Sequence, residues 1–168
     1  MSSPCIYYVE GECEERFLAA MKLQPAKLVP GRVRVFNVVQ NLIPKSQLLE
    51  IQRGSIIVLV FDTDVMKTDY LQKNMERLKK YCRKVRIVFL PQVLDFEDEL
   101  VRNTDVREVR ELTKSSTNKE FKRDFCRMTA QTCRQTLDHH HLDMNRMWSS
   151  TLPDGFSFVL KNSKIVKL

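Results

Sequence analysis

Three acidic residues stand directly after two short apolar runs of the sequence. Glu10 follows residues 5–9, and Asp62 and Asp64 follow residues 55–61, the strongest strand signal in the chain. Side chains just past the ends of parallel strands line the crevice where open α/β sheets bind ligands. Residues two apart leave an extended strand on the same side, so both aspartates can face one ion. Because hard divalent cations such as Mg²⁺ take oxygen ligands, the pattern predicts a metal site of Glu10, Asp62 and Asp64.

The same acids also have a plainer interpretation as helix caps. Asp64 can cap a helix that follows it, and Glu12 can lie favourably at the positive end of a helix dipole. Either motif alone favours this interpretation. Their joint occurrence, each directly after a buried strand, favours the shared metal site.

The elements that must position these acids alternate along the first part of the chain. Strands are expected at residues 5–9, 33–39, 55–61 and 84–90, the last one ended by Pro91. Helices are expected at residues 12–23, 44–49 and 70–82. Residues 55–61 are apolar at every position but the first, as a central parallel strand requires when helices cover both faces. The alternation predicts an α/β fold with a doubly wound, four-stranded parallel sheet.

The pattern changes after Phe96. Short helices are expected at residues 97–103 and 106–112, and a longer helix at residues 118–137. Residues 156–160, after a turn at Pro153-Asp154-Gly155, have the pattern of an edge strand. The chain is therefore divided into an α/β core over residues 1–103 and a basic, mainly helical extension over residues 104–168 that packs on it.

Residues 114–134 of the extension carry a cluster of lysines and arginines, and the whole chain of 168 residues has a formal charge of +7. Ser116 or Thr117 can cap the following helix, whose free N–H groups would attract an anion. Lys114 or Lys119 is expected to stabilise charge on a scissile phosphate. The alternative is a solvated basic face on an amphipathic helix. The residues expected to hold a nucleic-acid backbone are Lys119, Lys122, Arg123 and Arg127.

The acidic motifs resemble a known family. Tyr8-Val9-Glu10-Gly11-Glu12-Cys13-Glu14 and Val58-Leu59-Val60-Phe61-Asp62-Thr63-Asp64 are similar to the motifs of the Toprim fold, shared by topoisomerases, bacterial primases, small ribonucleases and OLD-type nucleases. The first motif looks most like the OLD and RloB-like branch, associated with bacterial and phage conflict systems. The resemblance covers residues 4–103. It implies a Toprim-like sheet and assigns Mg²⁺ or Mn²⁺ binding for phosphodiester chemistry to Glu10, Asp62 and Asp64.

A further acid follows the last strand of the core. Phe96-Glu97 resembles the late acidic position that OLD- and RloB-like proteins place beside the metal site, which implies that Glu97 is a second metal ligand, with Asp98 as its substitute. The alternative is the acidic first turn of a helix that Asp95 caps. The residues alone do not separate the two interpretations.

The sequence also departs from the family. Val65-Met66-Lys67 follows the aspartate pair, where Toprim proteins often have a further acid or a glycine. The zinc-binding and helicase-associated parts of primases are missing, as is the catalytic tyrosine domain of topoisomerases. Neither of those two activities is therefore expected.

The function expected from these observations is that of a Mg²⁺- or Mn²⁺-dependent nuclease, in which metals activate a water and neutralise the leaving oxygen. The expected partners are nucleic acid, DNA or RNA, and a separate ATPase or other protein chain, while homodimerisation is left open. A second interpretation is a non-catalytic module that binds a partner protein or nucleic acid. A third, phosphoryl transfer to a small substrate, would require a Gly-rich phosphate loop, and the chain has only 4 glycines.

Cysteine usage and hydropathy bear on the compartment. The 5 cysteines form no CxxC pair, and no apolar run approaches the roughly 20 residues that span a bilayer. A reduced, cytoplasmic setting without a membrane is expected, with the cysteines as small buried hydrophobes. Cys126 and Cys133 are seven residues apart, so they are expected to share a core-facing helical stripe.

Overall fold

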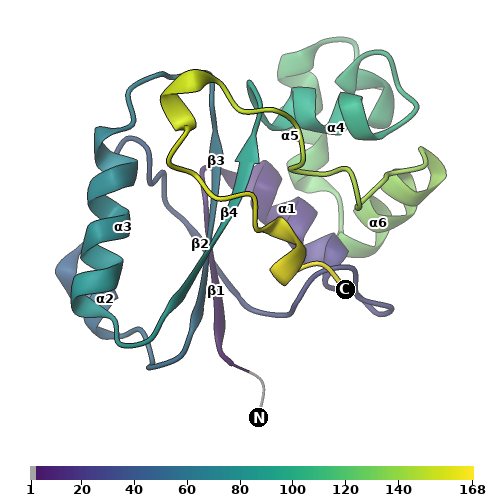
Figure 1. Cartoon of the computed structure of the whole chain (residues 1–168). Coiled ribbons are helices and arrows are strands. Elements are labelled where there is room, and N and C mark those ends of the chain that lie inside the picture. The colour runs from purple at the N-terminus through teal and green to yellow at the C-terminus, as the bar shows by residue number, and fades with distance from the viewer. Residues whose placement is uncertain (1–2) are drawn as a thin grey trace.

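The computed structural model describes residues 3–168 and contains one sheet of four parallel strands. The strand order in this sheet is β2-β1-β3-β4, with β1 and β3 in the centre (Figure 1). The predicted doubly wound α/β fold is confirmed and is consistent with the Toprim-like sheet that the resemblance implies. The strands are β1 (Cys5–Val9), β2 (Arg32–Val35), β3 (Ile56–Asp62) and β4 (Arg86–Gln92).

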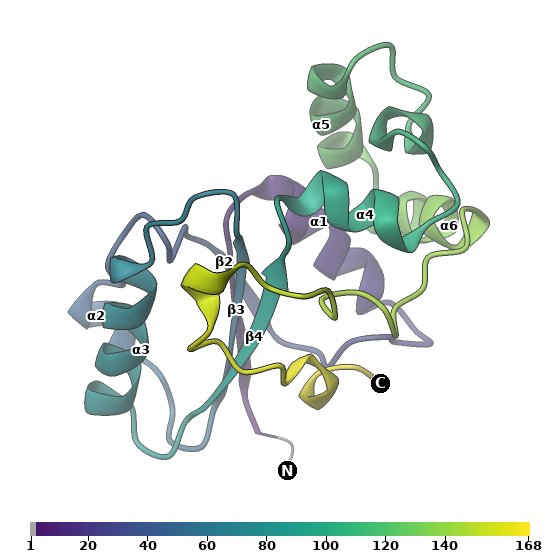
Figure 2. The same ribbon diagram turned by 45° about the horizontal axis from the view of Figure 1, so that its top comes forward.

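Helices cover both faces of this sheet. The helices α2 and α3 cover one face, while α1 covers the other, with α4, α5 and α6 beyond it (Figures 1 and 2). Within residues 3–168 no helix is both long and apolar enough to cross a membrane. The helices are α1 (Glu12–Met21), α2 (Lys45–Leu49), α3 (Asp69–Tyr81), α4 (Phe96–Asn103), α5 (Asn118–Arg127) and α6 (Ala130–His139), with 3₁₀ turns η1 (Val109–Leu112), η2 (Asp154–Phe156) and η3 (Ser163–Ile165).

The apolar side chains of the strands alternate between two cores, because successive residues of a strand point to opposite faces. On β3, Val58 and Val60 pack toward α1, whereas Ile57, Leu59 and Phe61 pack toward α2 and α3. All five are buried. Since burying one such side chain contributes about 1.5–3 kcal/mol, β3 anchors both halves of the fold.

Strand β4 continues through Pro91, so the expectation that Pro91 ends the strand is wrong. Pro91 pairs with Phe61, and Gln92 pairs with Asp62. Proline is tolerated on an edge strand because its missing N–H then costs no ladder hydrogen bond. Since β4 has a neighbour on one side only, its last two residues extend the sheet up to Asp62.

Strand β2 is shorter than expected, ending at Val35 and not at Val39. The side chain of Asn37 accepts hydrogen bonds from the N–H groups of Val39 and Gln40, both at 3.0 Å. Asparagine forms such local bonds readily and so starts a turn in place of a strand.

The single helix predicted over residues 118–137 is two helices. Helix α5 ends at Arg127, Met128 adopts an extended conformation (ψ 147°), and Thr129 caps α6 by accepting a hydrogen bond from the N–H of Thr132 at 3.0 Å. Threonine side chains compete for backbone groups in this way and favour helix starts over helix interiors. The helix expected over residues 106–112 is only the 3₁₀ turn η1.

The edge strand expected over residues 156–160 is absent from the described residues, where η2 occupies Asp154–Phe156 instead. The side chain of Asn162 forms the bonds to β4 that a fifth strand would make. Its Oδ1 accepts from the N–H of Phe89 at 2.9 Å, and its Nδ2 donates to the carbonyl of Ile87 at 2.9 Å. One asparagine carries both a donor and an acceptor, so it covers this stretch of the edge without a strand.

Buried Glu99 ties the C-terminal segment to α4. Its carboxylate accepts hydrogen bonds from the backbone N–H of Trp148 at 2.6 Å and from the Nδ2 of Asn103 at 3.1 Å. Arg102 forms an ion pair with it at 2.7 Å. The extension is thus held to the core by a charged group that no water reaches.

We expect Glu99→Ala to lower the free energy of unfolding by about 3 kcal/mol, because it leaves buried donors without an acceptor. Urea denaturation followed by circular dichroism measures this loss. Glu76→Ala, which truncates an exposed glutamate on α3, is the matched control and should change stability by less than about 0.5 kcal/mol. Equal effects of the two substitutions would contradict the role of Glu99.

Candidate metal centre

Glu10 and Asp62 lie side by side where the two central strands end. Strands β1 and β3 are hydrogen-bonded neighbours, with Tyr8 in register with Leu59. Glu10 follows β1 directly, and Asp62 is the last residue of β3. The Oε1 of Glu10 accepts a hydrogen bond from the backbone N–H of Asp62 at 3.2 Å. The structure therefore brings together the first two acids that the sequence singled out.

These two acids line a cavity of about 360 Å³ that is rich in carboxylates. Strand ends, the first turn of α1, α4 and α5 all contribute to it. Lys122 is the only cation in its lining. The lining residues are Glu10, Gly11, Glu12, Cys13, Glu14, Asp62, Phe96, Glu97, Lys122 and Cys126.

Aromatic packing holds the helices around this cavity. Phe96 of α4 makes edge-to-face contacts with Phe17 of α1 and Phe125 of α5, with ring centroids 5.6 and 5.9 Å apart. Trp148 of the C-terminal segment packs against Phe17 at 6.0 Å. Because these rings are buried, the acids of α1 and α4 are positioned by the apolar core.

Burial makes the charged forms of these carboxyls unfavourable. Burial raises the pKa of Glu10 to about 7. The hydrogen bond from the N–H of Asp62 lowers this pKa, while the charges of Glu14 and Asp64 raise it further. Burial raises the pKa of Asp62 to about 9, and the nearby acids, Glu10 foremost, raise it further. The pKa of Glu14 is also raised, chiefly by burial and then by Glu97. The metal-free cavity therefore favours the protonated, neutral forms of these carboxyls over their charged forms.

Asp62 supplies the clearest sign of a missing partner. Its Oδ1 is buried and has no hydrogen-bond partner among the described residues. A buried carboxylate oxygen without a partner is costly unless a cation or a proton satisfies it. A hard divalent cation matches the oxygen donors and can take the place of the carboxyl protons, so the residue types fit Mg²⁺ or Mn²⁺.

The side chains are not preassembled around an ion. Within residues 3–168 no group of three or more His, Cys, Asp or Glu side chains is arranged so that it could hold a metal. Ligation by these acids therefore requires side-chain rotation toward the cavity. Glutamates have several rotatable bonds for this movement, which makes Glu10, Glu14 and Glu97 the adaptable members.

Asp64 lies apart from the other acids. It is exposed and is not part of the cavity lining, and its backbone N–H donates to the carbonyl of Leu94 at 3.1 Å. Its charge still raises the pKa of Glu10 and of Asp62. Helix α3 starts only at Asp69, after Thr68, so Asp64 does not cap it.

Of the acids after β4, one caps a helix and another lies at the cavity. Asp95 caps α4, since its Oδ1 accepts from the N–H of Asp98 at 2.9 Å. Glu97 instead lines the cavity and pairs with Lys122 at 2.9 Å. This contact raises the pKa of Lys122, which therefore stays protonated. Asp98 is outside the cavity lining.

The basic residues of the extension are spread around α5. Thr117 caps the helix, as its hydroxyl accepts from the N–H of Glu120 at 3.1 Å. Lys114 and Lys119 are exposed and are not in the cavity lining. Four basic residues lie on α5 itself. Lys119 and Arg127 are exposed, and Lys122 lines the cavity. Arg123 pairs with Asp124 at 2.9 Å.

The sequence interpretation missed three features of the site. Glu14 was part of the first motif but was not assigned a role, although it lies four residues after Glu10, and the structure places it buried in the cavity wall. Cys126 faces Cys13 with their Sγ atoms 3.0 Å apart, so it does not share a stripe with buried Cys133. Gln92, beside Asp62 in the sheet, is buried with its side-chain amide unpaired among the described residues.

Comparisons with protein-family models, with curated proteins and with solved structures return no match for this chain.

Proposed function

We propose that the chain is a divalent-metal-dependent nuclease domain of the Toprim type, acting on nucleic-acid phosphodiesters. The observation that carries the proposal is the cavity at the ends of β1 and β3, where Glu10, Glu14, Asp62 and Glu97 meet with one lysine. The resemblance of the two acidic motifs to OLD- and RloB-like proteins supports the same chemistry and a role in bacterial or phage defence.

The ligands of Mg²⁺ or Mn²⁺ in this proposal are Asp62, Glu10 and Glu14, with Glu97 at a second position, while Asp64 lies outside the cavity lining and acts through its charge. When bound, the metal would supply the charge that activates a water and neutralises the leaving oxygen. Ionised Asp62 is unfavourable in the free protein, since burial raises its pKa to about 9. Binding of a cation is therefore coupled to the release of a proton from these carboxyls.

Glu10 and Lys122 have distinct tasks. Glu10, whose pKa burial raises to about 7, binds the metal as the carboxylate and releases its proton when the cation enters. Protonated Lys122 lines the cavity, where it forms an ion pair with Glu97, and its charge stabilises a phosphate oxygen. In this role Lys122, the lysine at the cavity, takes the place expected of Lys114 or Lys119.

Calorimetric titration with Mn²⁺ beside a nuclease assay on single- and double-stranded DNA and RNA tests the proposal. We expect Mn²⁺ binding to the wild type and cleavage of at least one substrate. Asp62→Asn should weaken Mn²⁺ binding by a factor of at least about 10, because it removes one ligand charge. Cleavage that persists in EDTA, or Mn²⁺ binding that Asp62→Asn leaves unchanged, would refute the metal centre.

A non-catalytic module is the second candidate. It is favoured by one observation, namely that the acids of residues 3–168 are not preassembled for a metal ion. In that case the domain recruits a nucleic acid or a partner protein, and the ion is structural or regulatory. Mn²⁺ binding without cleavage of any nucleic acid is the outcome that selects this candidate.

A further inference from the structure

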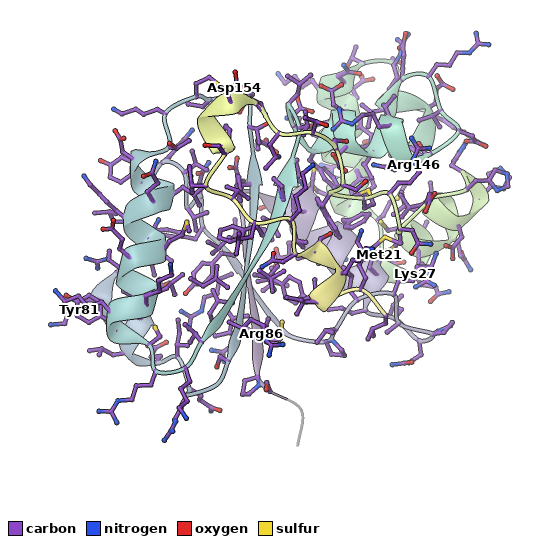
Figure 3. All side chains as sticks on the ribbon, viewed as in Figure 1. Met21, Lys27, Tyr81, Arg86, Arg146 and Asp154 are labelled. Carbon is purple, nitrogen blue, oxygen red and sulfur yellow. The ribbon has the colours of Figure 1, made fainter. Side chains whose placement is uncertain are left out.

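Five basic side chains surround a second cavity at the opposite end of the sheet. This cavity of about 380 Å³ is lined only by the five cations and by Cys82. Tyr81 and Arg86 mark this end of the molecule, far from Asp154 (Figure 3). We call the five residues the basic corner: Arg53, Lys79, Lys80, Arg83 and Lys84.

The backbone holds the basic corner in place. The N–H of Gly54 donates to the carbonyl of Arg83 at 3.1 Å, which ties the loop before β3 to the turn after α3. The N–H of Arg86 donates to the carbonyl of Ser55 at 3.0 Å. Buried Cys82 bonds the carbonyl of Leu48 through its Sγ at 3.4 Å. The cations thus project from segments that are fixed to one another.

No acid of the described residues compensates the basic corner. None of its five side chains forms an ion pair or donates a side-chain hydrogen bond within residues 3–168. On α5, by contrast, Lys122 and Arg123 are both paired with acids at 2.9 Å. The dipole of α3 favours cations in its last turn, where Lys79 and Lys80 lie. It does not explain the three cations that lie outside the helix.

The ring of nearby Tyr81 adds to this positive surface. The Nζ atoms of Lys45 and Lys80 lie 5.4 Å from its centroid, and the Cζ of Arg77 lies at 5.7 Å. The ring faces attract these cations and keep them gathered on the same side of the molecule. Like charges held this close raise the local positive potential and favour an extended anion.

We propose that the basic corner binds the sugar-phosphate backbone of a nucleic acid, as a second contact remote from the acidic cavity. The proposal rests on the proposed function for the identity of the polyanion. Five cations from three segments suit a row of phosphates better than one small anion. A membrane surface is less well matched, since the lining contains no large apolar side chain that could insert between lipids.

The distance between the two sites sets the length of nucleic acid that reaches both. Strand β3 runs from Ile56, beside the basic corner, to Asp62 at the cavity. Six residue steps of about 3.3 Å separate these ends by about 20 Å. At about 3.4 Å per base pair, a duplex must extend about six base pairs beyond the cleaved phosphate to touch both.

The test compares two double variants that each remove two positive charges. Lys79→Ala/Arg83→Ala changes the basic corner, and Lys161→Ala/Lys164→Ala changes exposed lysines of the C-terminal segment. Lys84 is left intact because its backbone φ of 54° makes substitution there a change of turn conformation as well. Fluorescence anisotropy in EDTA, with labelled DNA and RNA of about 6 and about 20 nucleotides or base pairs, measures binding without cleavage.

We expect Lys79→Ala/Arg83→Ala to weaken binding of the long nucleic acids by a factor of about 10, with a salt dependence reduced by about two phosphate contacts. The control variant should bind like the wild type at both lengths, and the short nucleic acids, which make fewer phosphate contacts, should bind every variant more weakly than the long ones. Equal affinity and salt dependence of both variants, or no nucleic-acid binding by the wild type, would overturn the proposal. The proposal would also be overturned if Lys79→Ala/Arg83→Ala lost binding to phosphatidylserine vesicles but kept the nucleic-acid affinity of the wild type.

The same measurements separate this inference from the proposed nuclease activity. Binding that depends on the basic corner, without cleavage in Mn²⁺, supports the second contact and refutes the nuclease. Cleavage of long substrates whose affinity is the same in both double variants supports the nuclease and refutes the second contact.

Discussion

Asp62→Asn and Glu10→Gln are each expected to reduce divalent-dependent cleavage by about 1,000-fold, which corresponds to about 4 kcal/mol of transition-state stabilisation. Both substitutions keep the shape of the side chain and remove its charge from the cavity at the strand ends. The measurement is the single-turnover cleavage rate in saturating Mn²⁺, on the substrate that the wild type cuts best.

Asp69→Asn and Glu76→Gln are the matched controls for this experiment. Both remove an exposed carboxylate on α3, outside the acidic cavity, and should leave the cleavage rate within a factor of about 2 of the wild type. Full activity of Asp62→Asn and Glu10→Gln would exclude both acids from the chemistry. A loss that the controls share would point to net charge and not to the site.

The metal-free protein is expected to gain stability from the same Asp62→Asn substitution. Burial raises the pKa of Asp62 to about 9 in the folded state, above its ordinary value of 3.8. The stability that Asp62 contributes is therefore complete below about pH 4 and is lost as the pH rises toward 9. Since pH 7 lies about 3 units above the ordinary pKa of Asp62 and one unit corresponds to about 1.4 kcal/mol, the neutral amide should stabilise the fold by up to about 4 kcal/mol at pH 7.

Urea denaturation in EDTA between about pH 4 and about pH 9 measures this effect. The free energy of unfolding of the wild type should fall relative to that of Asp62→Asn across this range, and Mn²⁺ should restore the wild type more than the variant. Asp69→Asn should follow the wild type. A pH profile of Asp62→Asn parallel to that of the wild type would show that the fold does not raise the pKa of Asp62.

The position of the acids explains why activity and stability oppose each other here. Among residues 3–168, Lys122 is the one cation that lines the cavity beside Glu10 and Asp62, and it pairs with Glu97. The fold is thus expected to tolerate unfavourable charge at the point where a metal binds, as functional sites often do.

The central strands of the fold could be predicted from local sequence patterns. The apolar run 56–61 and the Glu10-Gly11 break predicted two parallel strands ending in acids, and the sheet order makes those strands neighbours. Such predictions succeed because side-chain alternation and the rules of parallel sheets depend on short segments. They fail where a single side chain sets the local structure. Asn37 ends β2, and Thr129 starts α6 where one long helix was expected. Asn162 covers the edge of β4 in place of a strand.

That Glu10 and Asp62 lie at the same edge of the sheet thus follows from residue order, since all parallel strands end there, whereas the sheet order makes their strands neighbours. The tertiary structure alone decided that Glu14 and Lys122 face the cavity while Asp64 lies outside it. It also decided that the basic corner forms no ion pair within residues 3–168, whereas Lys122 and Arg123 of α5 are paired with acids. These outcomes depend on how distant segments dock, as with Cys13 and Cys126, 113 residues apart. Burial and charge compensation arise only from such contacts, so no local pattern contains them.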